Sequence, residues 1–228
     1  MENATANHNE KEIIMSTAPQ LPLPETGSML DTGRTALLVI DVQNDFAAPA
    51  GAIGRAGVDM SAIAPALDNI HALIAAARSA GTPVIFARVI TTPETDTRAQ
   101  KLLARRTGQD PDSIAICRKD TWGAAYHQVQ PERGEIEIQK RLYSCFYGTN
   151  LEDILKGRGI DTLVLTGFST NCCVESTARD GFHRDFNIFI VKDACADYGM
   201  AAHEASLGAL SGQCALPIST HDVLRAWT

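Results

Sequence analysis

Asp41, Lys140 and Cys173 are the residues of this chain whose types and positions suggest chemistry, because each follows a run of residues typical of a β-strand. Cys173 lies in the first turn of a predicted helix, where free backbone N–H groups and the helix dipole favour a thiolate. A thiol nucleophile also needs a base that accepts its proton and a cation that stabilises its charge. An aspartate and a lysine at other strand ends supply both, so the three residues together predict a site for nucleophilic catalysis.

Each of the three has a simpler explanation when it is taken alone. An acid after a strand is commonly a turn former, a lysine there is commonly a solvated charge, and a cysteine at a strand–helix turn is commonly a small packing residue. If Asp41 and Lys140 lie together in a partly dry pocket, each stabilises the charge of the other, and Lys140 stabilises the Cys173 thiolate. The three groups would then titrate together, so that no pKa value could be assigned to one residue alone.

Six predicted strands position these residues. Strands that alternate with helices predict right-handed crossovers and a parallel sheet, in which ligands bind beyond the carboxyl ends of the strands. We therefore expect an α/β fold: a single-domain, three-layer α/β/α sandwich with a six-stranded, mostly parallel, Rossmann-like sheet in the order 3-2-1-4-5-6. The strands are expected at 35–41, 83–90, 135–139, 161–166, 187–191 and 215–219.

The segments between the strands are of three kinds. Residues 1–30 are polar and then proline-containing, which predicts a flexible or extended arm ahead of one globular domain, and packing along a neighbouring subunit is an equal alternative. Residues 91–134 form a long irregular excursion of the kind that is usually functional, and residues 42–51 are expected to be a loop. Helices are expected at 63–80, 97–106, 150–156, 171–185 and 200–210, with a final helical turn after the last strand.

Composition and charge exclude several classes of function. A formal net charge of -7 without a run of Lys and Arg argues against nucleic acid or an anionic membrane surface as a partner. No apolar run approaches the length of a membrane span or forms a signal peptide. The six cysteines lack C-x-x-C spacing, and a bridge between Cys172 and Cys173 would be strained. We therefore expect reduced thiols in a cytoplasmic enzyme.

Three ordered motifs resemble those of the isochorismatase-like cysteine hydrolases. They read VIDVQNDF at 39–46, KRLYSCFYGT at 140–149 and GFSTNCCVESTARDGF at 167–182. The similarity runs from about residue 35 to the end of the chain, so we expect an isochorismatase-like hydrolase domain over residues 31–228. This family includes nicotinamidases, N-carbamoylsarcosine amidases, ureidoacrylate hydrolases, and biuret and triuret hydrolases.

The resemblance implies that Asp41, Lys140 and Cys173 form a catalytic triad. Asp41 would take the thiol proton, the thiolate would attack an amide or ureide carbonyl, and backbone N–H groups would hold the oxyanion. A non-proline cis peptide is implied before Ser169, and the oxyanion donors are expected to be the N–H groups of Ser169, Cys172 and Cys173. We assign the nucleophile to Cys173 and interpret the Cys172 side chain as a packing group that points elsewhere.

The substrate-binding residues are less sharply defined. Gln213 lies in the loop from which biuret-type enzymes offer a glutamine to the distal amide, and an exposed loop residue is an equally good explanation. Arg179 and Arg184 are interpreted as surface or intersubunit charges, and contact with a substrate carboxylate is the alternative. The candidates for substrate binding are Gln43, Phe46, Trp122, Tyr143, Phe146 and Gln213. Four of them, Gln43, Phe46, Tyr143 and Phe146, could instead be core or turn residues.

The resemblance also bears on metals. Nicotinamidases of this family bind a metal through a D-x-H motif after the second strand and a later histidine. Residues 88–97 contain no histidine here, and the histidines elsewhere show no ligand-like spacing. We predict no metal and no cofactor.

The predicted function is that of a cysteine amidohydrolase acting on carbon–nitrogen bonds of linear amides other than peptide bonds. It would cleave a small ureide or carbamoyl amide through a thioester and release ammonia, with biuret or triuret favoured and ureidoacrylate or N-carbamoyl amino acids as alternatives. Two other hypotheses stay open: an isochorismatase-type vinyl-ether hydrolase, in which the acid acts without the thiol, and a non-catalytic scaffold or thiol sensor. The expected partners are the small-molecule substrate and further copies of the chain in a homo-oligomer.

Overall fold

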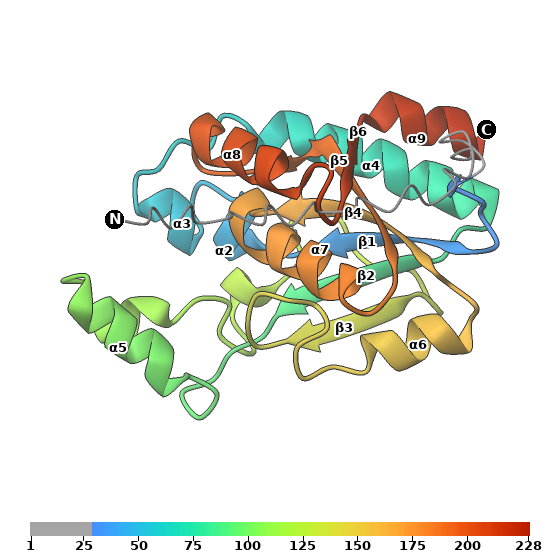
Figure 1. The fold of residues 1–228 in the computed structure, drawn as a ribbon. Helices are drawn as coiled ribbons and strands as arrows, with labels where there is room; N and C mark the ends of the chain where they lie inside the picture. Colours follow the sequence, from blue (N-terminus) through green and yellow to red (C-terminus); the bar gives the residue numbers. More distant parts are fainter. Residues whose placement is uncertain (1–28) are drawn as a thin grey trace, which may run out of the picture.

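Residues 29–228, which the computed structural model describes, contain one parallel sheet between two layers of helices (Figure 1). The predicted α/β class, the parallel sheet and its order β3-β2-β1-β4-β5-β6 are confirmed. The arm expected over residues 1–30 falls almost wholly outside the described residues. The strands are β1 (Thr35–Ile40), β2 (Val84–Val89), β3 (Ile136–Lys140), β4 (Thr162–Phe168), β5 (Asn187–Ala196) and β6 (Leu216–Ile218).

Helices cover both faces of this sheet. α4 (Ile63–Ala80) and α9 (Thr220–Trp227) pack against each other on one face. α6 (Leu151–Gly157), α7 (Glu175–Phe182) and α8 (Met200–Leu210) pack on the other, as Figure 1 shows. No helix within residues 29–228 combines the length and the apolar character needed to cross a membrane.

The central strand β1 is buried along its whole length, as a continuous apolar run predicts. Its side chains point alternately toward the helices on the two faces of the sheet. Leu37 and Val39 pack into the cluster that contains α4, whereas Leu38 and Ile40 pack into the cluster beneath α6 and α7. The strand is therefore anchored from both sides, and this fixes the position of Asp41, which follows it directly.

Several predicted boundaries are wrong in an informative way. The expected loop 42–51 contains the short helix α2 (Asn44–Ala47), and α3 (Ala52–Arg55) follows it. The helix expected over 171–185 begins instead as a π-helical turn, η3 (Thr170–Val174), which continues into α7. The final turn is the two-turn helix α9, closed at its start by a capping box between Ser219 and Asp222.

Gly167 in β4 has no room for a side chain. Its φ is 116°, and a Cβ there would lie 2.0 Å from the carbonyl oxygen of Ile40 on the neighbouring strand β1. We expect Gly167→Ala to lower the free energy of unfolding by about 3 kcal/mol, because both the backbone conformation and the strand spacing oppose the methyl group. Urea denaturation measures this difference.

Gly208 in α8 provides the matched control. A Cβ at Gly208 would meet nothing within 4 Å. Gly208→Ala is therefore expected to stabilise the fold by about 0.5–1 kcal/mol, because alanine is the better helix former. Equal effects of the two substitutions would contradict the role given to Gly167.

Candidate active site

Asp41 and Lys140 form a fully buried ion pair at the carboxyl end of the sheet. Lys140 Nζ donates to Asp41 Oδ2 at 2.6 Å, and both side chains are 0% exposed. Lys140 Nζ also donates to the carbonyl oxygen of Leu142 at 3.1 Å, which fixes the turn after β3. The Cys173 thiol interacts with the same carboxyl group, and the buried Oδ1 atom of Asp41 lacks a hydrogen-bond partner within residues 29–228. The structure therefore brings the three predicted triad residues together.

Burial and charge act in opposite directions on this pair. Burial raises the pKa of Asp41, although the charge of Lys140 opposes the shift. Burial alone would lower the pKa of Lys140, but the charge interactions with Asp41, Cys173 and Cys145 and the hydrogen bond to Asp41 together outweigh it and raise that pKa. The ammonium group thus stays charged, while the carboxylate binds a proton more readily than an ordinary aspartate does. These are the properties needed in a base that must also return its proton.

Cys173 does not have the low pKa that its position at a helix start predicts. The thiol is 5% exposed. The neighbouring Cys172 thiol, burial and the Asp41 carboxylate all raise the pKa of Cys173 well above its ordinary value, and Lys140 opposes them only in part. Burial and the negative charge of Asp41 therefore affect the pKa of Cys173 more than the helix dipole and the backbone N–H groups do. The resting group is a neutral thiol, which makes a nearby base necessary.

Cys172 lies closer to the site than predicted. Its side chain is half-buried and lines the same cavity as Cys173, so the prediction that it points elsewhere is wrong. The interaction with the Cys173 thiol lowers the pKa of Cys172. Its backbone N–H donates to the carbonyl oxygen of Ser169 at 3.2 Å, and so it is already engaged within the turn. The Cys173 N–H is the better candidate for an oxyanion donor.

The cysteine turn, residues 168–174, is held by hydrogen bonds to α8 and to a neighbouring strand end. The Asn171 N–H donates to Asp197 Oδ2 at 2.9 Å, just beyond the end of β5. The peptide between Phe168 and Ser169 is cis, as the resemblance implies. The π-helical geometry that follows is a form often found at functional sites.

The second and third motifs are joined to each other by side chains. Thr177 Oγ1 donates to the Cys173 carbonyl oxygen at 2.7 Å and accepts from the Cys145 N–H at 3.0 Å. Ser144 Oγ donates to Asp180 Oδ2 at 2.6 Å. The loop after Lys140 is therefore fastened to the helix that begins at the cysteines.

Removal of the Thr177 hydroxyl is expected to loosen this connection. Thr177→Val leaves the buried Cys145 N–H without its acceptor, so the free energy of unfolding should fall by about 1–3 kcal/mol. Thr177→Ser keeps the hydroxyl and should retain most of the stability. Chemical denaturation of the two variants tests this, and an equally large loss in both would show that the methyl group matters instead.

The cavity in front of Cys173 has a volume of about 280 Å³. Phe46 and Tyr143, predicted from the motifs, line it together with Ser169 and both cysteines. Its outer wall comes from α5 (Arg98–Arg106) and the segments around it, within the excursion predicted to be functional. The wall residues that sequence reasoning did not name are Val89, Thr91, Thr95, Asp96, Gln100, Leu103, Ala104, Gln109, Ile114, Ile116, Arg141 and Leu142.

Gln43 and Asp45 hold loops in place and do not line this cavity. The Gln43 amide donates to the carbonyl oxygens of Val89 and Ala124 at 2.8 and 2.9 Å and accepts from the Val89 N–H at 2.8 Å. Asp45 Oδ2 accepts from the Cys117 N–H at 2.7 Å. Gln43 is 0% exposed and has no amide group left for a substrate, so we interpret it as a positioning residue.

The other predicted contacts lie away from the cavity. Trp122 is 56% exposed, and Phe146 is buried in the core cluster beneath α6 and α7. Gln213 lines a separate cavity on the β5 and β6 side of the molecule. Arg179 pairs with an acid on its own helix, and Arg184 pairs with acids on α6 and α7, which agrees with their interpretation as structural charges.

Comparison with known proteins assigns the chain to a family. Residues 35–222 match the model of the isochorismatase domain. The chain belongs to the isochorismatase family. It is 37% identical over 201 residues to the ureidoacrylate amidohydrolase RutB of Methylobacterium radiotolerans, covering 82% of this chain and 77% of that protein. It is 38% identical over 178 residues to the RutB of Yersinia enterocolitica, with 74% and 77% covered.

Solved structures with the isochorismatase-family fold superpose on this chain. A cysteine hydrolase from Pseudomonas syringae pv. phaseolicola superposes with a TM-score of 0.75 at 27% identity, over 86% of this chain and 93% of that one. An N-carbamoylsarcosine amidase from Thermoplasma acidophilum gives 0.64 at 27% identity, over 82% and 96%. The predicted family and the predicted class, a hydrolase of carbon–nitrogen bonds in linear amides, are confirmed. No group of three or more His, Cys, Asp or Glu side chains in the described part of the chain is arranged to hold a metal ion.

Proposed function

We propose that this hydrolase is a cysteine amidohydrolase that cleaves the ureide group of ureidoacrylate. The observation that carries the chemistry is the Cys173 thiol beside the buried Asp41–Lys140 pair, at the base of a cavity of about 280 Å³. The choice of substrate is supported by relatives named ureidoacrylate amidohydrolase at 37% identity. Biuret and triuret lose support, because Gln213 lies at a different cavity.

Asp41 acts as the base in the proposed mechanism. It takes the proton of Cys173, and the thiolate attacks the ureide carbonyl carbon. The oxyanion is held by backbone N–H groups of the cysteine turn, with Cys173 as the principal donor. Protonated Asp41 then returns the proton to the departing nitrogen, which leaves an S-carbamoyl enzyme, a thioester-type intermediate.

Water completes the cycle. It attacks the carbamoyl group with Asp41 again as base, and the carbamate formed decomposes to ammonia and carbon dioxide. Lys140 keeps its charge throughout and stabilises both the Asp41 carboxylate and the thiolate.

A panel of ammonia-release assays tests the substrate. Ureidoacrylate should give the highest kcat/KM among ureidoacrylate, biuret, triuret, N-carbamoyl amino acids and nicotinamide. Trapping of a carbamoylated Cys173 by mass spectrometry should accompany turnover. Release of ammonia from biuret but not from ureidoacrylate would replace the proposed substrate and leave the mechanism intact, whereas no ammonia from any of them would refute both.

The pH dependence of kcat/KM should show the raised pKa of Asp41. The active form of the free enzyme has Asp41 deprotonated, so activity should rise with pH as this group loses its proton. Because burial raises that pKa, the acid limb should lie above the ordinary aspartate value of 3.8. An acid limb at or below that value would contradict the role of a buried carboxylate as base.

A further inference from the structure

Arg141 gives the cavity a charge that the proposed mechanism does not use. It is the only positively charged side chain among the described residues that line this cavity. No residue between 29 and 228 forms an ion pair or a hydrogen bond with its guanidinium group. Arg141 Nη2 lies beside Gly148, where a Cβ would be 3.4 Å from it. The guanidinium group therefore keeps its full hydrogen-bonding capacity for a ligand.

The other charged side chains that line the cavity or lie behind Cys173 are balanced within the protein. Asp96, the one acid in the lining, accepts from Arg118 at 2.6 and 2.8 Å and lies 3.7 Å from Lys101 Nζ. At the base of the cavity, Asp41 and Lys140 neutralise each other. The cavity thus has a net positive charge that comes from Arg141, in a chain whose formal net charge is -7. Such a charge distribution favours an anionic ligand.

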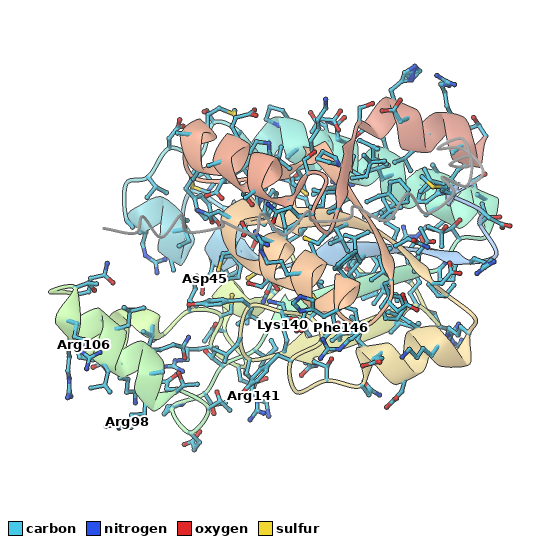
Figure 2. The ribbon with its side chains drawn as sticks, in the orientation of Figure 1. Asp45, Arg98, Arg106, Lys140, Arg141 and Phe146 are labelled. Carbon is cyan, nitrogen blue, oxygen red and sulfur yellow. The ribbon has the colours of Figure 1, made fainter. Side chains whose placement is uncertain are left out.

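The position of Arg141 is fixed by its neighbours in the chain. It follows Lys140 directly, and the bond from Lys140 Nζ to the Leu142 carbonyl oxygen holds the turn that carries it. Figure 2 shows Lys140 in the interior of the molecule and Arg141 nearer its edge, on the side of the chain that faces α5. A small substrate held at Cys173 by one end would therefore present its other end to the rim where Arg141 lies.

We propose that Arg141 binds a carboxylate of the substrate and selects ureides that carry one. This inference rests on the proposed function and names the part of the site that recognises the acid group of ureidoacrylate. A guanidinium group is suited to this because its planar fork donates two parallel hydrogen bonds to a carboxylate. Neutral ureides such as biuret make no such ion pair, so Arg141 separates the two substrate classes.

The test compares ureidoacrylate with its methyl ester, which keeps the ureide and loses the negative charge. In Arg141→Gln, KM for ureidoacrylate should rise by about tenfold or more, whereas KM for the ester should change by less than about twofold. Arg141→Lys keeps the charge without the fork and should restore part of the loss. Arg106→Gln is the matched control, since Figure 2 places Arg106 at the far side of α5, and its KM values should stay within about twofold of the wild type.

Binding to the Cys173→Ala protein gives a readout that does not depend on turnover. Calorimetric titration should show tighter binding of ureidoacrylate than of the ester, and this preference should disappear when Arg141→Gln is added. Equal binding of acid and ester by the Cys173→Ala protein, or equal effects of Arg141→Gln on both, would overturn the role of Arg141. Wild-type enzyme that binds ureidoacrylate with this preference but releases no ammonia from it would overturn the proposed function alone.

Discussion

Cys173→Ala is expected to reduce kcat for ammonia release by about 10⁴-fold or more, with the fold unchanged. The thiol is the only nucleophile placed against the buried carboxylate in the part of the chain that the structure describes. Loss of the sulfur removes the covalent step, and the remaining groups can only bind the substrate. A steady-state ammonia assay measures the loss, and circular dichroism checks the fold.

Two other cysteine variants make this result specific. Cys214→Ala removes a thiol from the cavity beside β6 and should leave kcat nearly unchanged. Cys172→Ala should retain activity within about tenfold, because the carbamoyl group is attached to Cys173 and not to its neighbour. If Cys172→Ala abolishes turnover and Cys173→Ala does not, the nucleophile has been assigned to the wrong thiol. If all three variants still release ammonia, none of these thiols alone is essential and the covalent role of Cys173 is wrong.

Lys140→Met is expected to have the second large effect, on both stability and activity. It leaves the Asp41 carboxylate buried and unpaired, which should lower the free energy of unfolding by about 3–5 kcal/mol. Asp41→Asn should cost a similar amount by leaving the ammonium group unpaired, and should reduce kcat/KM by about 10³-fold through loss of the base. Asparagine is the suitable replacement because Asp41 has a φ of 53°, a conformation that asparagine tolerates.

The double variant separates the two effects. In Asp41→Asn/Lys140→Met neither group is charged, so much of the stability should return while activity stays lost. Lys156→Met is the surface control: Lys156 is 59% exposed in its pair with Glu152, and its loss should change stability by less than about 0.5 kcal/mol. A double variant as unstable as the sum of the singles would show that the pair does not act as a unit. Urea denaturation and ammonia release are the two measurements.

The elements best predicted from the sequence are those whose local signals agree with their environment. The bounds of α4 and α8 are those expected, and α4 ends at Gly81, whose φ is 73°. β1 was recognised because it is buried on both faces and therefore apolar throughout. The three motifs placed Asp41, Lys140 and Cys173 at one edge of the sheet for the same reason: the topology of a parallel sheet decides which strand ends meet.

The parts that sequence reasoning missed depend on contacts between distant segments. The side-chain amide of Gln43 is hydrogen-bonded to the backbone of Val89 and Ala124, and no local sequence pattern predicts these contacts. The raised pKa of Cys173 comes from burial and from Asp41, whereas the sequence showed only the helix start. Arg141 was visible as a basic residue after the catalytic lysine, but its lack of a partner within residues 29–228 could be known only from the fold.

The order of the strands also has a consequence for how the protein forms. β1 lies in the middle of the sheet, and Thr35 pairs with Thr162 of β4, more than half of the chain later. Pairings of such high contact order are slow, because a long loop must close before any contact compensates for its entropy. During synthesis, one edge of β1 therefore stays open until β4 has left the ribosome, and this apolar edge is where premature aggregation would begin. Asp41, the proposed base, is therefore synthesised early, but the site around it is complete only after the segment that carries Cys173 has been synthesised.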